Sequence, residues 1–241
     1  MRTRRRINLW SSPRNISTAL MYAFAQRPDT AVVDEPLYAH YLAHQPTEAE
    51  HPGREQVMES QSQRGNEVVQ QLLHHDYGSP YVVFKQMTHH LVDLDLGFLN
   101  NMTNVLLIRD PYEILASFGQ VIDRVTAEDV GLPQQSELFD RLTVTGCLSA
   151  VVDARRLLDD PPAVLERLCD CLGIDYDDAM LSWPAGPKEY DGAWAEHWYA
   201  GVHRSTGFES RPRRVLELSP DLATVAEETH PIYQRLLEHA I

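Results

Sequence analysis

The sequence has few cysteines, and their spacing excludes two classes of small protein. Among 241 residues there are three cysteines, Cys147, Cys169 and Cys171, and no two of them form a CxxC pair. An odd number with this spacing argues against a disulfide framework and against a zinc site. No other metal-ligand spacing occurs in the sequence, so we expect no metal. We expect the cysteines to be small buried hydrophobic residues in a reducing cytoplasm.

No segment typical of membrane targeting stands at the beginning of the sequence. Residues 1–6 are basic, but only Ile7 to Trp10 follow as an apolar run. This run is too short for the core of a signal peptide or for a membrane span. We therefore expect a cytoplasmic protein.

Positive charge is scarce. The chain has 21 Lys and Arg residues against 35 Asp and Glu, which gives a net charge of −14. So acidic a protein is a poor candidate for nonspecific binding to a nucleic-acid backbone. An anionic ligand would need basic side chains gathered locally, against this trend. The hydrophobic fraction of 43% is that of an ordinary globular protein, whose core needs neither disulfides nor metal.

Short apolar runs alternate with helical patterns along much of the chain. Strands are predicted at residues 7–10, 30–33, 81–85, 104–108 and 148–152. The continuous apolar run from Val105 to Ile108 is typical of a strand that is covered on both faces in a parallel sheet. Strands that alternate with helices predict βαβ units. We therefore expect an α/β fold with three αβα layers and a central, mostly parallel sheet, in one domain over residues 1–241.

Helical patterns dominate the last third of the chain. Helices are predicted there at residues 163–172 and 223–240, with a stretch rich in Gly and aromatic residues at 183–208. A further helix is predicted near the start of the chain, at residues 13–26. Residues 44–66 are almost wholly polar and contain Pro46, Pro52 and Gly53. Three interpretations of residues 44–66 stay open: a surface excursion, a lid over a site, or a dimer contact.

The polar segment at residues 11–18 joins the first predicted strand to the first predicted helix. In a doubly wound sheet, ligands bind at the carboxyl ends of the strands, and a helix N-terminus there offers N–H groups to a phosphate. Arg14 adds a bidentate cation, and Ser17 and Thr18 add hydroxyl donors. The segment is not a Walker A loop, because GxxxxGK(S/T) is missing. It predicts an anion site, with an ordinary helix start and a chance arginine as the alternative.

A second polar segment, Arg109-Asp110-Pro111, follows the strand predicted at 104–108. Arg109 should project at the same edge of the sheet, while Pro111 suits the first turn of the next helix and Asp110 its cap. Ser117 lies about two turns along that helix and can face the loop at residues 11–18. Alone, the arginine is equally compatible with a surface salt bridge.

Together the two segments resemble those of the sulfotransferase family. Residues 13–18 are similar to a PKSGTTW or PRSGST loop, which in that family holds the 5′-phosphosulfate end of 3′-phosphoadenosine-5′-phosphosulfate (PAPS). Arg109-Asp110-Pro111 with Ser117 is similar to the segment that holds the 3′-phosphate. The resemblance implies a P-loop NTPase-like fold, with PAPS as co-substrate and 3′-phosphoadenosine-5′-phosphate (PAP) as product. It implies nucleotide contacts from Arg14, Asn15, Ile16, Ser17, Thr18, Arg109, Ser117 and Lys188.

Some positions depart from the family pattern. Ile16 stands where the loop usually has glycine, which removes backbone freedom at a place of close approach to the phosphate. Of the family's Arg-Lys-Gly segment only Lys188 remains. The run Gly192-Ala193-Trp194 is similar to the segment that closes over the nucleotide.

Sulfonyl transfer needs a general base near the acceptor and cations at the transferring group. Glu35, at the end of the second predicted strand, resembles the glutamate that some bacterial and tyrosyl-protein sulfotransferases place near the donor sulfur. His89 and His90 resemble the histidine of cytosolic sulfotransferases, at a longer spacing from Lys85. A histidine suits base work near neutral pH, whereas a glutamate needs its pKa raised by burial. Both alternatives stay open; Lys85 and Arg14 are the expected cations, and Lys85 equally suits a salt bridge.

The sequence thus predicts a sulfotransferase that moves a sulfonyl group from PAPS to a hydroxyl, or similar nucleophile, of a small-molecule metabolite. The alternatives are a nucleotide-dependent kinase or other phosphotransferase on a P-loop fold, and a non-catalytic homologue that binds PAP. We expect a small-molecule acceptor as partner, and neither nucleic acid nor membrane. A homodimer is an expectation drawn only from how often such enzymes pair.

Overall fold

The computed structural model describes residues 5–44, 51–118, 125–209 and 218–241. Within these residues, five strands form one sheet in the order β2-β3-β1-β4-β5, and every pairing is parallel. The strands are β1 (Arg5–Ser11), β2 (Thr30–Asp34), β3 (Tyr81–Met87), β4 (Thr103–Ile108) and β5 (Leu148–Asp153). All five predicted strands are confirmed, and the α/β fold class with them.

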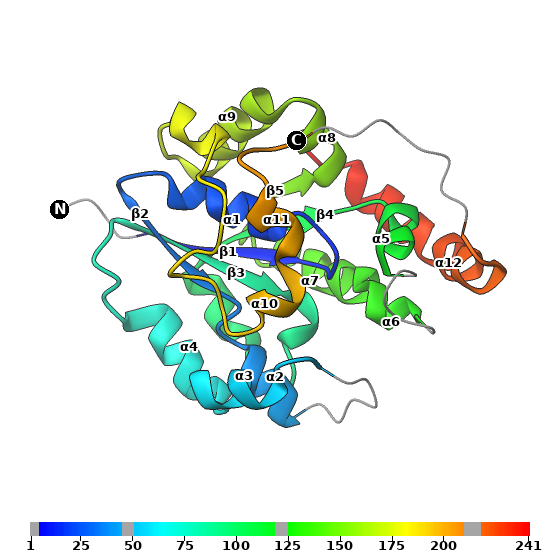
Figure 1. Cartoon of the computed structure of the whole chain (residues 1–241), viewed down its shortest axis with the longest axis horizontal. Coiled ribbons are helices and arrows are strands. Elements are labelled where there is room, and N and C mark those ends of the chain that lie inside the picture. Colours follow the sequence, from blue (N-terminus) through cyan, green and yellow to red (C-terminus); the bar gives the residue numbers. More distant parts are fainter. Residues whose placement is uncertain (1–4, 45–50, 119–124, 210–217) are drawn as a thin grey trace.

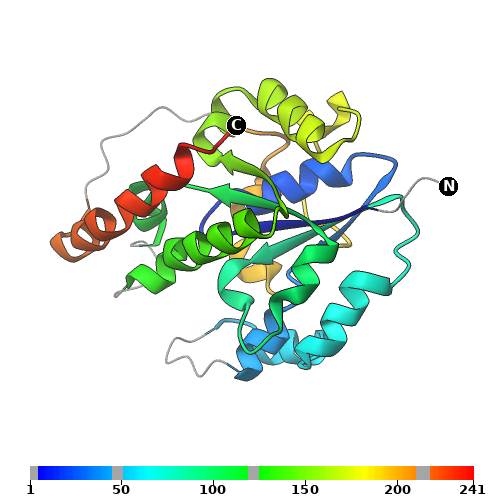
Figure 2. The same ribbon diagram turned by 180° about the vertical axis from the view of Figure 1, so that it is seen from behind.

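Helices cover both faces of the sheet and make three layers (Figure 1). One face carries α1 (Ser17–Ala25), α8 (Ala154–Asp159) and α9 (Pro161–Leu172). The other carries α4 (Gly65–His74), α5 (Pro111–Phe118), α7 (Leu132–Val144) and α12 (Pro220–Leu237). Side chains of β1 alternate between the layers, because Leu9 packs on the first face and Trp10 on the second. Figure 2 shows α7 and α12 side by side on the second face.

Short helices complete the described chain. They are α2 (Tyr38–His44), α3 (Arg54–Ser60), α6 (Ala127–Val130), α10 (Ala195–Trp198), α11 (Ala200–Arg204), η1 (Thr88–His90), η2 (Leu96–Asn101) and η3 (Asp178–Leu181). After α12 the C-terminus returns to the sheet edge, where the N–H of Ile241 donates to the carbonyl of Val151 at 3.0 Å. In the described part of the chain, no helix has the length and apolar character that crossing a bilayer demands.

The polar stretch at residues 44–66 partly folds against the site end of the sheet; residues 45–50 lie outside the described residues. Val57 of α3 is buried in a small cluster with Tyr38 and Trp194. Gln61 donates from its amide to the carbonyl of Glu35 at 3.0 Å. The described part therefore covers the end of β2, while its roles as a lid or a dimer contact stay predictions.

The expectation of three buried cysteines is only partly right. Cys169 is buried, Cys147 is half-buried, and Cys171 is exposed, and none is in a disulfide. Cys169 and Cys171 lie two positions apart on α9, so they point to different sides of the helix. Only the first of them faces the sheet.

Candidate active site

The chain between β1 and α1 forms a tight loop at the carboxyl edge of the sheet. Arg14 has a φ of +55°, in the left-handed region. Asn15 ties the loop to β4, because its Nδ2 donates to the carbonyl of Leu107 at 3.0 Å and its Oδ1 accepts from the N–H of Ile16 at 2.8 Å. These constraints hold residues 13–16 outside the helix, so α1 begins at Ser17 rather than at the predicted residue 13.

The N-terminus of α1 is left open for an anion. Ile16 occupies the cap position with a φ of −93°, and no side chain caps the helix. The first N–H groups of a helix have no partner within it, so they are available to a ligand. Because the φ of Ile16 is negative, a side chain is tolerated there. The residue of this loop with the left-handed backbone is Arg14, not the position where the family has glycine.

Two arginines and a serine meet beside this helix end. The Nε of Arg14 donates to the Oγ of Ser117 at 2.9 Å, and Nη1 of Arg109 donates to the backbone carbonyl of Arg14 at 2.6 Å. Burial, and the neighbouring charge of Arg109, lower the pKa of Arg14. Glu113 balances only part of this charge, through an ion pair with Arg109 at 3.1 Å. Residues some 95 positions apart are thus brought together as the two sequence segments predict.

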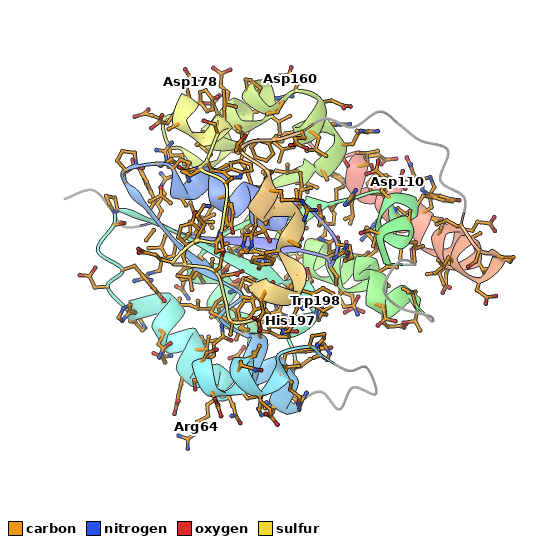
Figure 3. All side chains as sticks on the ribbon, viewed as in Figure 1. Arg64, Asp110, Asp160, Asp178, His197 and Trp198 are labelled. Atoms are coloured by element: carbon orange, nitrogen blue, oxygen red, sulfur yellow. The ribbon has the colours of Figure 1, made fainter. Side chains whose placement is uncertain are left out.

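Asp110 has the local role that its position indicates. Its Oδ1 accepts from the N–H of Tyr112 at 2.9 Å, at the start of α5. Figure 3 shows Asp110 at the beginning of this helix. It is a cap there, as predicted from the Arg109-Asp110-Pro111 segment.

A cavity of about 2260 Å³ opens at this edge of the sheet. Most small-molecule sites enclose about 300–1,000 Å³, so the space is ample for a nucleotide and a second small molecule together. Its lining includes all but one of the predicted site residues: Arg14, Asn15, Ile16, Ser17, Thr18, Glu35, Lys85, His89, His90, Arg109 and Ser117.

The exception is Lys188, which the structure does not bring to the cavity. Its Nζ donates to the carbonyl of Pro184 at 2.7 Å and to that of Gly186, and it lies 5.1 Å from the centre of the Tyr22 ring. The ammonium group of Lys188 is thus already paired with two backbone carbonyls and an aromatic ring. A phosphate contact from Lys188 would require these contacts to be exchanged.

A buried cluster of charged side chains lies at the ends of β2 and β3. The Nζ of Lys85 donates to Oδ1 of Asp34 at 3.0 Å, to Oε1 of Glu35, and to the hydroxyl of Tyr199 at 2.6 Å. The side chain of Lys85 is fully buried. The salt bridge that the sequence allows for Lys85 is present.

Burial shapes the protonation of this cluster. Burial raises the pKa of Glu35, Asp34 acts in the same direction, and Lys85 opposes both. Burial alone would lower the pKa of Lys85, but the charges of Asp34 and Glu35 raise it. Burial and the same two carboxylates raise the pKa of Tyr199 well above its usual value. Glu35 therefore has the raised pKa that base work by a carboxylate requires.

His89 and His90 lie in an aromatic part of the cavity. The ring of His90 stacks against both Tyr38 and Tyr41, with centroids 4.8 Å away in each case, and His89 contacts Tyr41 edge-on. Burial lowers the pKa of His89 to about 4 and that of His90 well below its usual value. Both imidazoles are therefore neutral at pH 7, and weak bases. This burial disfavours base work by either histidine, and the choice between the histidines and Glu35 stays a prediction.

Sequence reasoning missed three members of the site region. In the sequence, Asp34 reads only as a strand end, while Trp194 and Tyr199 suit either core packing or the lining of the acceptor side, and neither reading gives them a hydrogen bond in a charged cluster. The structure gives Tyr199 a place in the charged cluster, and Trp194 donates from Nε1 to its hydroxyl at 3.0 Å. The only sequence signal was the adjacency of Asp34 to Glu35. Figure 3 shows Trp198 beside His197 on α10; Trp198 lines the cavity and His197 does not.

Comparison with known proteins gives a family match over almost the whole chain. A family model described as a sulfotransferase domain matches residues 5–236. Two curated proteins of Arabidopsis thaliana are similar, branched-chain-amino-acid aminotransferase-like proteins 1 and 2. They are 38% and 35% identical over 237 and 235 residues, which is 97% of this chain in each case. These stretches make up 42% and 41% of the relatives, so the chain spans about two fifths of their length.

Solved structures share the fold at low sequence identity. A sulfotransferase from Alicyclobacillus acidocaldarius has a TM-score of 0.58 at 14% identity, over 99% of this chain and 98% of that one. The sulfotransferase domain from the curacin biosynthetic pathway has a TM-score of 0.55 at 16% identity, over 95% and 98%. A mouse sulfotransferase complexed with PAP has a TM-score of 0.52 at 10% identity, over 97% and 88%. By the family match and this fold, the chain belongs to the sulfotransferase family.

Proposed function

We propose that this sulfotransferase moves a sulfonyl group from PAPS to a hydroxyl, or similar nucleophile, of a small-molecule metabolite and releases PAP. Family membership makes the chain a transferase. The observation that carries the proposal is the meeting of Arg14, Arg109 and Ser117 beside the open N-terminus of α1. Two guanidinium groups with helix N–H groups suit a ligand that carries more than one anionic group.

The residues present fit the two ends of PAPS. In this proposal the loop, with Arg14, Ser17 and Thr18, holds the 5′-phosphosulfate, and Arg109 with Ser117 holds the 3′-phosphate. The Nε of Arg14 is committed to Ser117, and within the described residues no acceptor contacts its Nη groups, which leaves them for the phosphosulfate. The mouse structure with PAP supports a nucleotide of this type in the fold.

The transfer is written as an in-line displacement at sulfur. A bond forms between the acceptor oxygen and sulfur while the bond from sulfur to the 5′-phosphate oxygen breaks, and PAP leaves with that electron pair. The acceptor proton passes to a carboxylate of the protein. Arg14 and the N–H groups of α1 stabilise the negative charge that grows on the leaving phosphate.

We assign the base to Glu35. It lines the cavity, burial raises the pKa of its carboxyl, and it lies in one cluster with Tyr199. Thr18, in the first turn of α1, lies within hydrogen-bonding reach of Tyr199, which links the cluster to the donor loop. The neutral imidazoles of His89 and His90, with Tyr38 and Tyr41, are better suited to contact the acceptor.

The remaining expectations belong to the same proposal. We expect a small-molecule acceptor, because aromatic side chains such as those of Tyr41 and Trp198 line the cavity. A net charge of −14 disfavours nucleic acid as a partner. We also propose a cytoplasmic location and a homodimer.

The test is PAP release from PAPS, followed by chromatography, first with water alone and then with neutral alcohols and phenols as acceptors. We expect release above the spontaneous rate, with the sulfonyl group recovered on the acceptor. Binding of PAP without any release from PAPS would leave the non-catalytic homologue as the better description. Phosphoryl transfer to the same acceptors, when ATP replaces PAPS, would favour the phosphotransferase.

A further inference from the structure

Asp34 makes more contacts in the charged cluster than a strand end requires. Its carboxylate accepts from Nζ of Lys85 at 3.0 Å, from the hydroxyl of Tyr199 at 2.8 Å, and from the N–H of Gly192 at 3.1 Å. Its side chain is 1% exposed. Unlike its neighbour Glu35, Asp34 does not line the cavity. It therefore holds other residues of the site without meeting a ligand itself.

Every donor of Lys85 is in use. An ammonium group has three N–H bonds, and those of Lys85 go to Asp34, Glu35 and Tyr199. Lys85 has no N–H left for a sulfonyl oxygen unless one of these bonds breaks. Its charge serves to hold the two carboxylates.

Tyr199 is fixed in the same way. Its hydroxyl accepts from Lys85 at 2.6 Å and from Nε1 of Trp194 at 3.0 Å, and it donates to Asp34 at 2.8 Å. The raised pKa of Tyr199 keeps the donated hydrogen in place. The phenol thus ties the segment before α11 to the end of β2.

The charges of the cluster do not balance. Two carboxylates, Asp34 and Glu35, share one ammonium group, so the ionised cluster holds one surplus negative charge in a buried place. A proton taken up by one carboxylate removes the surplus. Asp34 has its oxygens occupied by three donors and is closed off from the cavity, whereas Glu35 faces it. The proton therefore goes to Glu35.

We propose that Asp34 is a positioning residue of the transfer step, which holds Lys85 and Tyr199 and so leaves Glu35 as the carboxylate that takes up the acceptor's proton. The inference rests on the proposed role of Glu35 as base. It adds that Asp34 supplies the surplus charge that makes Glu35 a strong enough base, and that Lys85 does not contact the sulfonyl group.

Other titratable groups also face this pair. From α2, the phenol of Tyr38 interacts with Glu35, and from η1, His90 interacts with Lys85. Both are neutral at pH 7, because burial raises the pKa of Tyr38 and lowers that of His90. The fixed charges on Glu35 among the described residues are therefore those of Asp34 and Lys85.

The pH dependence of Asp34→Asn tests this role. The rate needs ionised Glu35, so kcat/KM falls as pH drops through the pKa of that group. Removing the negative charge beside it should lower this pKa, and we expect the acid limb to move to lower pH by about 1 unit or more. We also expect kcat on the plateau to fall roughly tenfold, because the base is weaker. The readout is PAP release from PAPS with benzyl alcohol, whose hydroxyl does not titrate in this range.

Asp191→Asn is the matched control. Asp191 lies in the same stretch as Gly192 and accepts from the hydroxyl of Tyr22 at 2.6 Å and from the N–H of Lys188 at 2.8 Å, but it touches neither Lys85 nor Glu35. We expect the acid limb of kcat/KM in Asp191→Asn to stay at the pH of the wild type. A slower Asp34→Asn with an unmoved acid limb would show a merely structural role and overturn the proposal, and so would an unchanged enzyme.

A second measurement does not depend on turnover. Asp34→Asn leaves a balanced pair of Lys85 and Glu35, so we expect it to fold. Titration of the glutamate side-chain carboxyl carbons by NMR should show one carboxyl with a raised pKa that is lost in Glu35→Gln and lowered in Asp34→Asn. If no glutamate carboxyl of the wild type has a raised pKa, the proposal is overturned, even if Asp34→Asn fails to fold. A wild type that shows it but releases no PAP from PAPS would contradict the proposed function alone.

Discussion

Arg109→Ala is expected to weaken the binding of PAP by roughly 10- to 100-fold, because it removes the charge-assisted contact that we propose with the 3′-phosphate. Adenosine 5′-monophosphate differs from PAP only in lacking the 3′-phosphate, so its affinity should fall much less in this variant. Some loss is expected for both ligands, since Arg109 also holds the carbonyl of Arg14 at 2.6 Å. Isothermal titration calorimetry with both nucleotides measures the difference.

Arg64→Ala is the control for this experiment. Arg64 does not line the cavity, its side chain is 80% exposed, and Figure 3 shows it far from Asp110. It should leave both affinities unchanged. If Arg109→Ala bound PAP as tightly as the wild type, or lost PAP and the monophosphate equally, Arg109 would not be the ligand of the 3′-phosphate.

Glu35→Gln is expected to lower kcat about 1000-fold, within the range by which a general base accelerates a reaction. The amide keeps the shape of the side chain and an acceptor for Lys85, but it takes up no proton. PAP affinity should stay near that of the wild type, because we propose that the donor contacts come from the β1–α1 loop and from Arg109. Single-turnover release of PAP from PAPS separates the chemical step from binding.

His89→Gln and His90→Gln provide the comparison. Each should reduce kcat less than Glu35→Gln and raise KM for the acceptor more, since both histidines are neutral at pH 7 and lie among aromatic side chains. A larger loss of kcat in either histidine variant, with Glu35→Gln close to wild type, would move the base to that histidine.

The sheet and the donor loop could be predicted because their signals are local. A run such as Val105 to Ile108 is apolar on both faces, and in a parallel sheet all strands end at one edge. Arg14 and Arg109 both follow such runs, so the fold class places them at the same edge of the sheet; that β1 and β4 are neighbours there is seen only in the structure. The start of α1 could not be placed, because it depends on the bond from Asn15 to the carbonyl of Leu107, 92 positions away.

The charged cluster could not be predicted because its members are distant in the sequence. Lys85 lies 51 positions from Asp34 and 114 from Tyr199. Nothing local to Tyr199 distinguishes a packing residue from a donor to a buried carboxylate. The choice between Glu35 and the two histidines as base stays open in the sequence for a related reason: the pKa of Glu35 and of His90 depends on burial, which only the packed structure gives.

The proposed site would bind PAP in preference to a nucleoside triphosphate. Calorimetric titration of the wild-type chain with PAP and with ATP compares the two directly. We expect PAP to bind, to raise the temperature of unfolding by mass action, and to bind more tightly than ATP. Binding of ATP without binding of PAP would contradict the assignment of Arg14, Arg109 and Ser117 to the sulfonyl donor.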